Sequence, residues 1–68
     1  MDAQKLMPKV RAIVADSGLT QQVIGLEMGY PPESARQSVS QFLQSENPTV
    51  SVVVRFCKAM DVGIGELL

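Results

Sequence analysis

Residues 17–42, SGLTQQVIGLEMGYPPESARQSVSQF, contain the pattern that decides the fold. Thr20 is a good N-cap residue, and Ile24 and Met28 lie four positions apart in the segment that follows, as on one face of a helix. Ile24 and Met28 are expected to face the core, with Val23 and Leu26 alongside them. A glycine and two prolines then interrupt the pattern. Apolar residues return at helical spacing around Val39. The stretch therefore predicts two short helices joined by a turn.

The glycines and prolines in this stretch predict its local geometry. Gly25 would cost about 1 kcal/mol inside a helix relative to alanine, so we expect a packing reason, namely that the next helix crosses close above it. Gly29 is expected to supply the tight turn. Pro32 suits the first position of the following helix, with Glu33 complementing its N-terminal partial charge. The inward-facing residues predicted for that helix are Ala35, Val39, Phe42 and Leu43.

A helix is also expected before this stretch. Its apolar residues follow helical spacing, and Gly18 is placed to end it. Its start is open, because the helix either begins near Pro8 or begins near Asp2 and bends at the proline. The apolar residues of this first helix are Leu6, Val10, Ile13 and Val14.

The last third of the chain predicts a further helix and a final turn. Residues 45–48 are expected to form a loop, and Thr49 to cap the helix that follows. The β-branched run at residues 50–54 is also compatible with a strand, but no second strand exists to pair with it. Residues 64–68 are expected to form a last helical turn whose leucines fill the core. The predicted apolar face of the helix consists of Val52, Val53, Phe56, Cys57 and Met60.

Composition narrows the class of protein. The chain has 68 residues, 46% of them hydrophobic, with a net charge of −1, one cysteine and no histidine. The length predicts one domain over residues 1–68. The helices expected above give it an all-α fold, a compact five-helix bundle. No apolar run approaches the ~20 residues that span a bilayer, and no signal-peptide pattern is present, so a cytoplasmic location is expected. Without histidine or paired carboxylates, we expect no enzyme activity, metal or cofactor.

Several motifs together resemble a known family. Residues 18–21 (Gly-Leu-Thr-Gln), the small residue Gly25, Gly29 closing the helix, and Val39-Ser40-x-Phe42 are similar to the helix-turn-helix domain of phage Cro and repressor proteins, the Xre family. Pro48-Thr49, residues 60–62 and Gly65-Glu66-Leu67-Leu68 are similar to its back half. The resemblance implies a lambda-repressor-like bundle whose second and third helices form a helix-turn-helix, and a sequence-specific DNA-binding transcriptional regulator, specifically a repressor.

One departure from the family lies between the two helices. The stretch between Gly29 and Val39 is about four residues longer than the family's usual turn. The additional residues either lengthen the turn or add a turn to the front of the recognition helix. These residues are Pro31, Pro32, Glu33 and Ser34.

The resemblance also assigns DNA contacts. Aligned through Val39-Ser40, the residues at Arg36, Gln37 and Ser38 match base-reading positions, where arginine can pair with guanine and glutamine with adenine. For Arg36, Gln37 and Ser38 the alternative is a polar helix face that contacts only solvent. For Ser34 the alternative is capping of that helix. The predicted DNA-binding residues are Thr20, Gln21, Ser34, Arg36, Gln37, Ser38, Ser40, Gln41 and Asn47. Cys57 is expected to be a buried apolar residue.

Charge raises an alternative function. Arg36 is the only basic residue in the predicted helix-turn-helix, and the basic patch usual for DNA binders is not obvious. A patch formed in space by Lys5, Lys9, Arg11 and Arg36 would favour DNA. Its absence, together with an exposed apolar patch, would favour a protein-interaction module on the same fold.

The expected partner is double-stranded DNA. One recognition helix gives useful affinity only with two half-sites, so we expect a homodimer or a larger regulator that contains this domain. No effector pocket is expected in so small a bundle. The candidate dimer contacts are exposed members of Val50, Val54, Val62 and Ile64, with Met1 and Met7 as weaker candidates.

Overall fold

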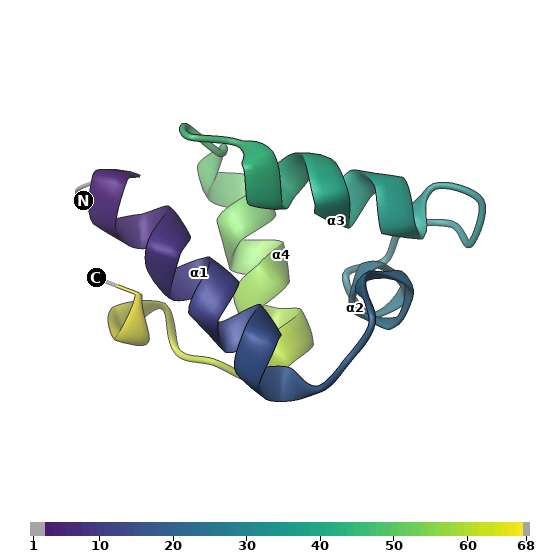
Figure 1. The fold of residues 1–68 in the computed structure, drawn as a ribbon, viewed down its shortest axis with the longest axis horizontal. Helices are drawn as coiled ribbons and strands as arrows, with labels where there is room; N and C mark the ends of the chain where they lie inside the picture. The colour runs from purple at the N-terminus through teal and green to yellow at the C-terminus, as the bar shows by residue number, and fades with distance from the viewer. Residues whose placement is uncertain (1–2, 68) are drawn as a thin grey trace.

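The computed structural model describes residues 3–67, which form helices connected by short loops (Figure 1). All regular structure in this part of the chain is helical, as predicted. The five-helix count is wrong, because the last element is a single 3-10 turn of three residues. The elements are α1 (Ala3–Ser17), α2 (Gln21–Glu27), α3 (Ala35–Gln44), α4 (Val50–Met60) and η1 (Ile64–Glu66).

Helix α1 passes through Pro8, so the alternative in which the helix begins near this proline is wrong. Pro8 is exposed, whereas Leu6 and Val10 are buried on the core side. A start at Asp2 itself lies outside the described residues. Gly18 follows the last residue of α1 with a φ of 71°, a left-handed conformation that glycine adopts without strain, and it ends the helix as expected.

Helix α2 has the predicted cap and the predicted close contact. The Thr20 Oγ1 accepts a hydrogen bond from the backbone N–H of Val23 at 3.1 Å. A Cβ added at Gly25 would lie 2.6 Å from the carbonyl carbon of Ala35 and 2.7 Å from its Cβ, and closer still to its oxygen. Only glycine allows α3 to approach α2 this closely. Gly29, with a φ of 94°, makes the turn after α2 as expected.

The connection between α2 and α3 corrects one prediction. The Ser34 N–H donates to the Pro31 carbonyl oxygen at 3.0 Å, which closes a four-residue turn with Pro32 at its second position. Proline is favoured at that position of a β-turn as well as at a helix start. Helix α3 begins at Ala35, so Pro32 and Glu33 lie in the turn rather than in its first turn. The extra residues lengthen the connection.

Helix α4 confirms the choice of helix over strand for residues 50–54. The Thr49 Oγ1 accepts from the Val52 N–H at 3.4 Å and caps the helix. Asp61, at a φ of 55°, reverses the chain after α4, and the Val62 N–H donates to the Cys57 carbonyl oxygen at 2.9 Å. The chain then returns toward α1 through η1 (Figure 1).

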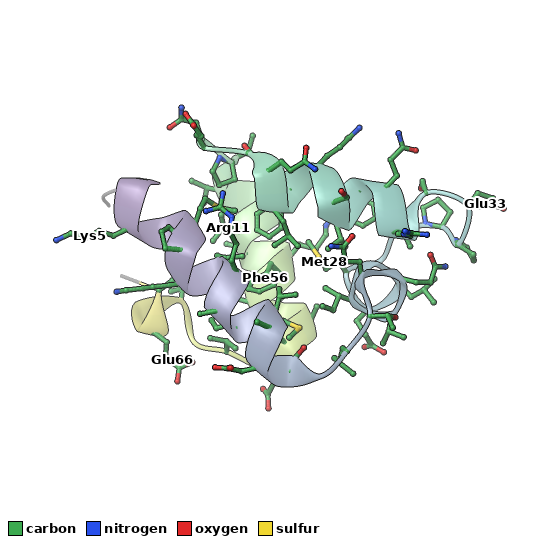
Figure 2. The ribbon with its side chains drawn as sticks, viewed as in Figure 1. Lys5, Arg11, Met28, Glu33, Phe56 and Glu66 are labelled. Atoms are coloured by element: carbon green, nitrogen blue, oxygen red, sulfur yellow. The ribbon has the colours of Figure 1, made fainter. Side chains whose placement is uncertain are left out.

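The core lies between α1, α3 and α4, and α2 covers one end of it. Phe42 and Phe56 meet with ring centroids 5.4 Å apart, and Figure 2 shows Phe56 and Met28 in the interior. Leu67 is buried, as predicted for the final leucines; Leu68 is outside the described residues. The buried side chains also include Leu6, Met7, Val10, Ile24, Ala35, Val39, Val53 and Cys57.

Two packing expectations were wrong. Val23 and Leu26, expected beside Ile24 and Met28, are exposed on the opposite side of α2. Met7, a weaker candidate for a dimer contact, is buried in the core. The first correction matters for function, because it leaves apolar side chains on an outer surface of α2.

Candidate functional site

The outward side of α3 is polar and almost uncharged. At about 100° per residue, the buried Ala35 and Val39 place Gln37 and Gln44 on the opposite side of the helix, and both are exposed. Figure 1 shows α3 along one edge of the molecule, with its outer side turned away from the other helices. The polar side chains on and beside this outer side are Arg36, Gln37, Ser40, Gln41 and Gln44.

Contacts with α2 and with the connection fix the orientation of α3. The Gly25 backbone lies against Ala35 in the first turn of α3. The Gln22 Nε2 donates to the Pro32 carbonyl oxygen at 3.1 Å, which ties the first turn of α2 to the turn before α3. These contacts hold the N-terminal half of α3, where Arg36 and Gln37 lie, in one position relative to α2.

Two arginines lie at opposite ends of α3, one from α3 itself and one from α1. Arg36 is exposed in the first turn of α3. The Arg11 Nε, from α1, donates to the Leu43 carbonyl oxygen at 2.8 Å in the last turn. Carbonyls in the last turn of a helix lack intrahelical partners and carry partial negative charge, so this contact stabilises the end of α3. Arg11 therefore serves the fold, and Arg36 remains free to reach a ligand.

The α4 side of α3 is a groove with a volume of about 400 Å³. It brings together three predicted site residues, Ser38, Gln41 and Asn47. Its floor is aromatic, and the Arg55 Cζ lies 5.4 Å from the centroid of the Tyr30 ring. The groove is an open hollow of the surface, and the expectation that the bundle holds no effector pocket stays a prediction. The remaining lining residues are Tyr30, Phe42, Ser45, Pro48, Thr49 and Val52.

The other predicted residues lie at the starts of α2 and α3. Thr20 is exposed, and its hydroxyl oxygen is engaged in the cap of α2; Gln21 is half-buried in the first turn. Ser34 occupies the N-cap position of α3 without a side-chain cap hydrogen bond. Its Oγ instead lies 3.5 Å from the Pro31 carbonyl oxygen, so the capping interpretation of Ser34 is wrong.

Four residues of this region were missed from sequence. Gln44 lies seven positions after Gln37, and its Nε2 lies 3.5 Å from the Ser40 Oγ, so helical spacing alone could have placed it on the outward side. The roles of Gln22, Tyr30 and Arg55 depend on contacts between separate elements. No local pattern signals such contacts.

The basic residues do not gather in one patch. Lys9 and Arg11 are two positions apart on α1, so their side chains leave opposite sides of the helix. Lys9 lines a hollow with Ile13, Val62 and Glu66, whereas Arg11 contacts α3. The basic patch that Lys5, Lys9, Arg11 and Arg36 would form together is therefore absent. Among the residues described, Arg36 is the single cation on the outward surface of α3.

Cys57 is buried, and burial, with a smaller contribution from the Glu66 carboxylate, raises the pKa of its thiol. Within residues 3–67, no three His, Cys, Asp or Glu side chains are placed to hold a metal ion. None of the helices described is long and apolar enough to cross a membrane.

The chain matches no protein-family model, no curated protein and no solved structure.

Proposed function

We propose that the chain is a sequence-specific DNA-binding transcriptional regulator, with α2 and α3 as a helix-turn-helix in a lambda-repressor-like arrangement. In this proposal α3 is the recognition helix and lies in the major groove. One observation carries the proposal: a row of amide and hydroxyl side chains on the outward side of a helix that two contacts with α2 and its connection hold in place. The dispersed basic residues and the exposed Leu19, Val23 and Leu26 support a second candidate function, a protein-interaction module on the same fold.

The outward side chains of α3 suit base edges. Glutamine can form two hydrogen bonds with an adenine and arginine two with a guanine, each worth about 1–3 kcal/mol of discrimination. Gln37 and Arg36 occupy the N-terminal half of α3, which is the half that helix-turn-helix proteins bring to the bases. Gln41, one turn further on, extends the same surface. Ten residues of helix span about 15 Å, enough to cross one major groove.

Phosphate contacts in this proposal come mainly from uncharged donors. The free N–H groups at the start of α2 attract anions, and Gln21 lies beside them. Asn47 and Thr49 border the groove next to α3 and are exposed, and in this proposal they contact the adjacent DNA backbone. Such contacts orient a protein on DNA without reading its sequence.

Binding of Arg36→Ala tests the role of α3 most simply. We expect the unchanged protein to bind a fluorescent random-sequence duplex at about 50 mM salt, where electrostatic contacts are strong. Arg36→Ala should weaken binding about five- to tenfold. Lys5→Ala is the matched control. Lys5 is exposed in the first turn of α1, points away from α3 (Figure 2) and does not line the groove proposed below for the dimer, so its loss should leave binding unchanged. Absence of binding by the unchanged protein would contradict the proposal.

We also propose that two copies bind DNA as a dimer, with half-sites about 34–36 Å apart, and repress transcription in the cytoplasm by occupying the promoter. Three of the four candidate contacts, Val54, Val62 and Ile64, line one groove between α4 and η1, with a volume of about 430 Å³. Lys58 and Asp61 border this groove. In a two-fold interface the same surface of both copies takes part, so residues that lie near each other on one copy can contact each other across the interface. Lys58 of one copy can therefore pair with Asp61 of the other.

Sedimentation of Ile64→Asp tests this interface. The unchanged protein should show a concentration-dependent dimer, and Ile64→Asp should shift it to monomer because a carboxylate would be buried without a partner. Val50→Asp, a change at an exposed residue outside the groove, should leave the dimer intact. A protein that remains monomeric with and without DNA would contradict the proposed dimer.

A further inference from the structure

The outward side of α2 is apolar. Leu19, Val23 and Leu26 are 46%, 39% and 43% exposed. Val23 and Leu26 lie three positions apart on α2, on the same side of the helix, and Leu19 lies in the loop directly before the N-cap residue Thr20. These three side chains, called here the α2 stripe, are exposed, whereas Ile24 and Met28 are buried. A helix at the surface of a globular protein normally carries polar residues on that side.

None of these three side chains belongs to the buried core. Ile24 and Met28 do belong to it, and Gly25 lies against Ala35 of α3. The helix start is stabilised by Thr20, and the connection to α3 by Gln22. Contiguous exposed apolar side chains without a structural role mark an interaction surface.

The charged residues nearest to the α2 stripe in sequence are acidic, and Arg36, in the first turn of α3, is the next cation along the chain. Residues 12–35 contain three acidic residues and no lysine or arginine. Asp16 lies in the last turn of α1, three residues before Leu19, and Glu27 lies on α2 four residues after Val23. Glu33 lies at the tip of the connection after α2 (Figure 2). All three carboxylates are exposed.

We propose that the α2 stripe docks an amphipathic helical segment of another protein, with apolar residues on one side and lysine or arginine residues flanking them. The apolar row would cover Leu19, Val23 and Leu26, and the basic residues would face Asp16, Glu27 and Glu33. The inference goes beyond DNA binding and does not depend on it, because it uses none of the proposed base-reading side chains.

Charge and area exclude a second copy of the chain as the occupant. Two α2 stripes brought face to face would bring only the carboxylates of Asp16, Glu27 and Glu33 toward one another, and like charges oppose such contact. A stable dimer buries about 800 Å² on each partner. A helix of seven residues, about 10 Å long, offers far less. A short partner helix, bound weakly and reversibly, fits this surface.

Three labelled helical peptides test the proposal. The first carries leucines at helical spacing flanked by lysines, the second carries the same leucines flanked by glutamates, and the third has the lysines with serines in place of the leucines. We expect the first to bind, with NMR shifts concentrated at Leu19, Val23 and Leu26, and the other two to bind at least tenfold more weakly. Salt should weaken the first peptide further, because its flanking contacts are exposed.

Matched variants locate the contact. Leu26→Gln should raise the Kd of the first peptide about fivefold, as loss of one apolar anchor does. Val50→Gln, at a residue 67% exposed on α4, should leave it unchanged. Glu27→Lys should weaken the lysine peptide and strengthen the glutamate peptide. Leu26 and Glu27 are exposed, so circular dichroism should show these variants folded.

Several results would overturn the inference. Equal binding of the lysine and glutamate peptides would do so, and so would peptide-induced shifts centred on Val54 and Ile64 instead of α2. Shifts of α2 that depend on protein concentration in the absence of peptide would also do so, because they would indicate that a second copy binds there. Because Leu26→Gln should bind DNA as the unchanged protein does, failure of this inference is distinguishable from failure of the DNA-binding proposal.

Discussion

At the scale of single residues, Gly25 lies where the backbones of α2 and α3 approach each other closely. Gly25→Ala should destabilise the protein by about 2 kcal/mol: the gain of about 1 kcal/mol in helix propensity is smaller than the cost of forcing the Ala35 backbone away. Urea denaturation measures this change, and thermal melting should show a Tm lower by roughly 10 °C.

Gly65→Ala is the control for this prediction. A Cβ at Gly65 would meet no atom within 4 Å, and Gly65 has no positive φ. Its substitution should change stability by less than about 0.5 kcal/mol. Equal effects at both glycines would contradict the close contact between α2 and α3.

Cys57 makes stability depend on pH in a defined direction. Burial raises the pKa of its thiol in the folded protein, whereas the unfolded thiol ionises near its ordinary value of about 8.5. Above that pH the unfolded state binds fewer protons than the folded state, so the free energy of unfolding falls as pH rises. The contribution is fully present below the unfolded pKa.

Comparison with Cys57→Val isolates this contribution from those of lysine and tyrosine. The unchanged protein should lose more stability than Cys57→Val between about pH 8 and pH 10 in urea titrations. The folded thiol should also react with a disulfide reagent much more slowly than the unfolded thiol. Parallel stability curves for the two proteins would contradict the raised pKa.

At the scale of the element, two residues in equivalent positions differ in function. Thr49 occupies the N-cap of α4 and accepts a hydrogen bond from the Val52 N–H, whereas Ser34 occupies the N-cap of α3 without such a bond. Thr49→Ala should therefore lower the free energy of unfolding by about 1 kcal/mol. Ser34→Ala should change it by less than about 0.5 kcal/mol, and a larger effect than at Thr49 would contradict this assignment.

The elements themselves could largely be predicted from the sequence. Helix ends were predicted at Gly18, Thr20 and Thr49, because threonine side chains cap helix N-termini and glycine commonly follows a helix C-terminus. Pro32 was assigned wrongly because proline suits both the first turn of a helix and the second position of a β-turn. The hydrogen bond from Ser34 to Pro31 decides between the two, and only the folded chain shows it.

The candidate site could be predicted in part, where helical spacing determines which residues face outward. Gln37 and Gln41 lie on the outward side of α3, which helical spacing alone predicts once Val39 is inside. The groove at Tyr30 and Asn47 brings together residues distant in sequence, and the contact of Arg55 with Tyr30 belongs to it. The exposure of Val23 and Leu26 was likewise hidden, because an apolar residue in a helix is normally assigned to the core.

At the scale of the whole molecule, the distribution of cations predicts a weak salt dependence of DNA binding. The chain has a net charge of −1, and its basic residues are dispersed over α1, α3 and α4. With Arg36 and one or two further cations meeting phosphates, the slope of log K against log salt should lie between about −1 and −3 per domain. Anisotropy titrations at several salt concentrations measure the slope. A value of about −5 or steeper would contradict this distribution.

The most direct test of the DNA-reading role of α3 is selection of binding sites from a randomised duplex pool at about 50 mM salt, with the unchanged protein and with Gln37→Ala in parallel. The account predicts that the unchanged protein enriches a two-fold symmetric sequence, and that Gln37→Ala loses the preference at one base pair in each half-site while keeping the others. Enrichment of no sequence, or the same base preferences with and without the Gln37 side chain, would contradict the proposal that α3 reads DNA.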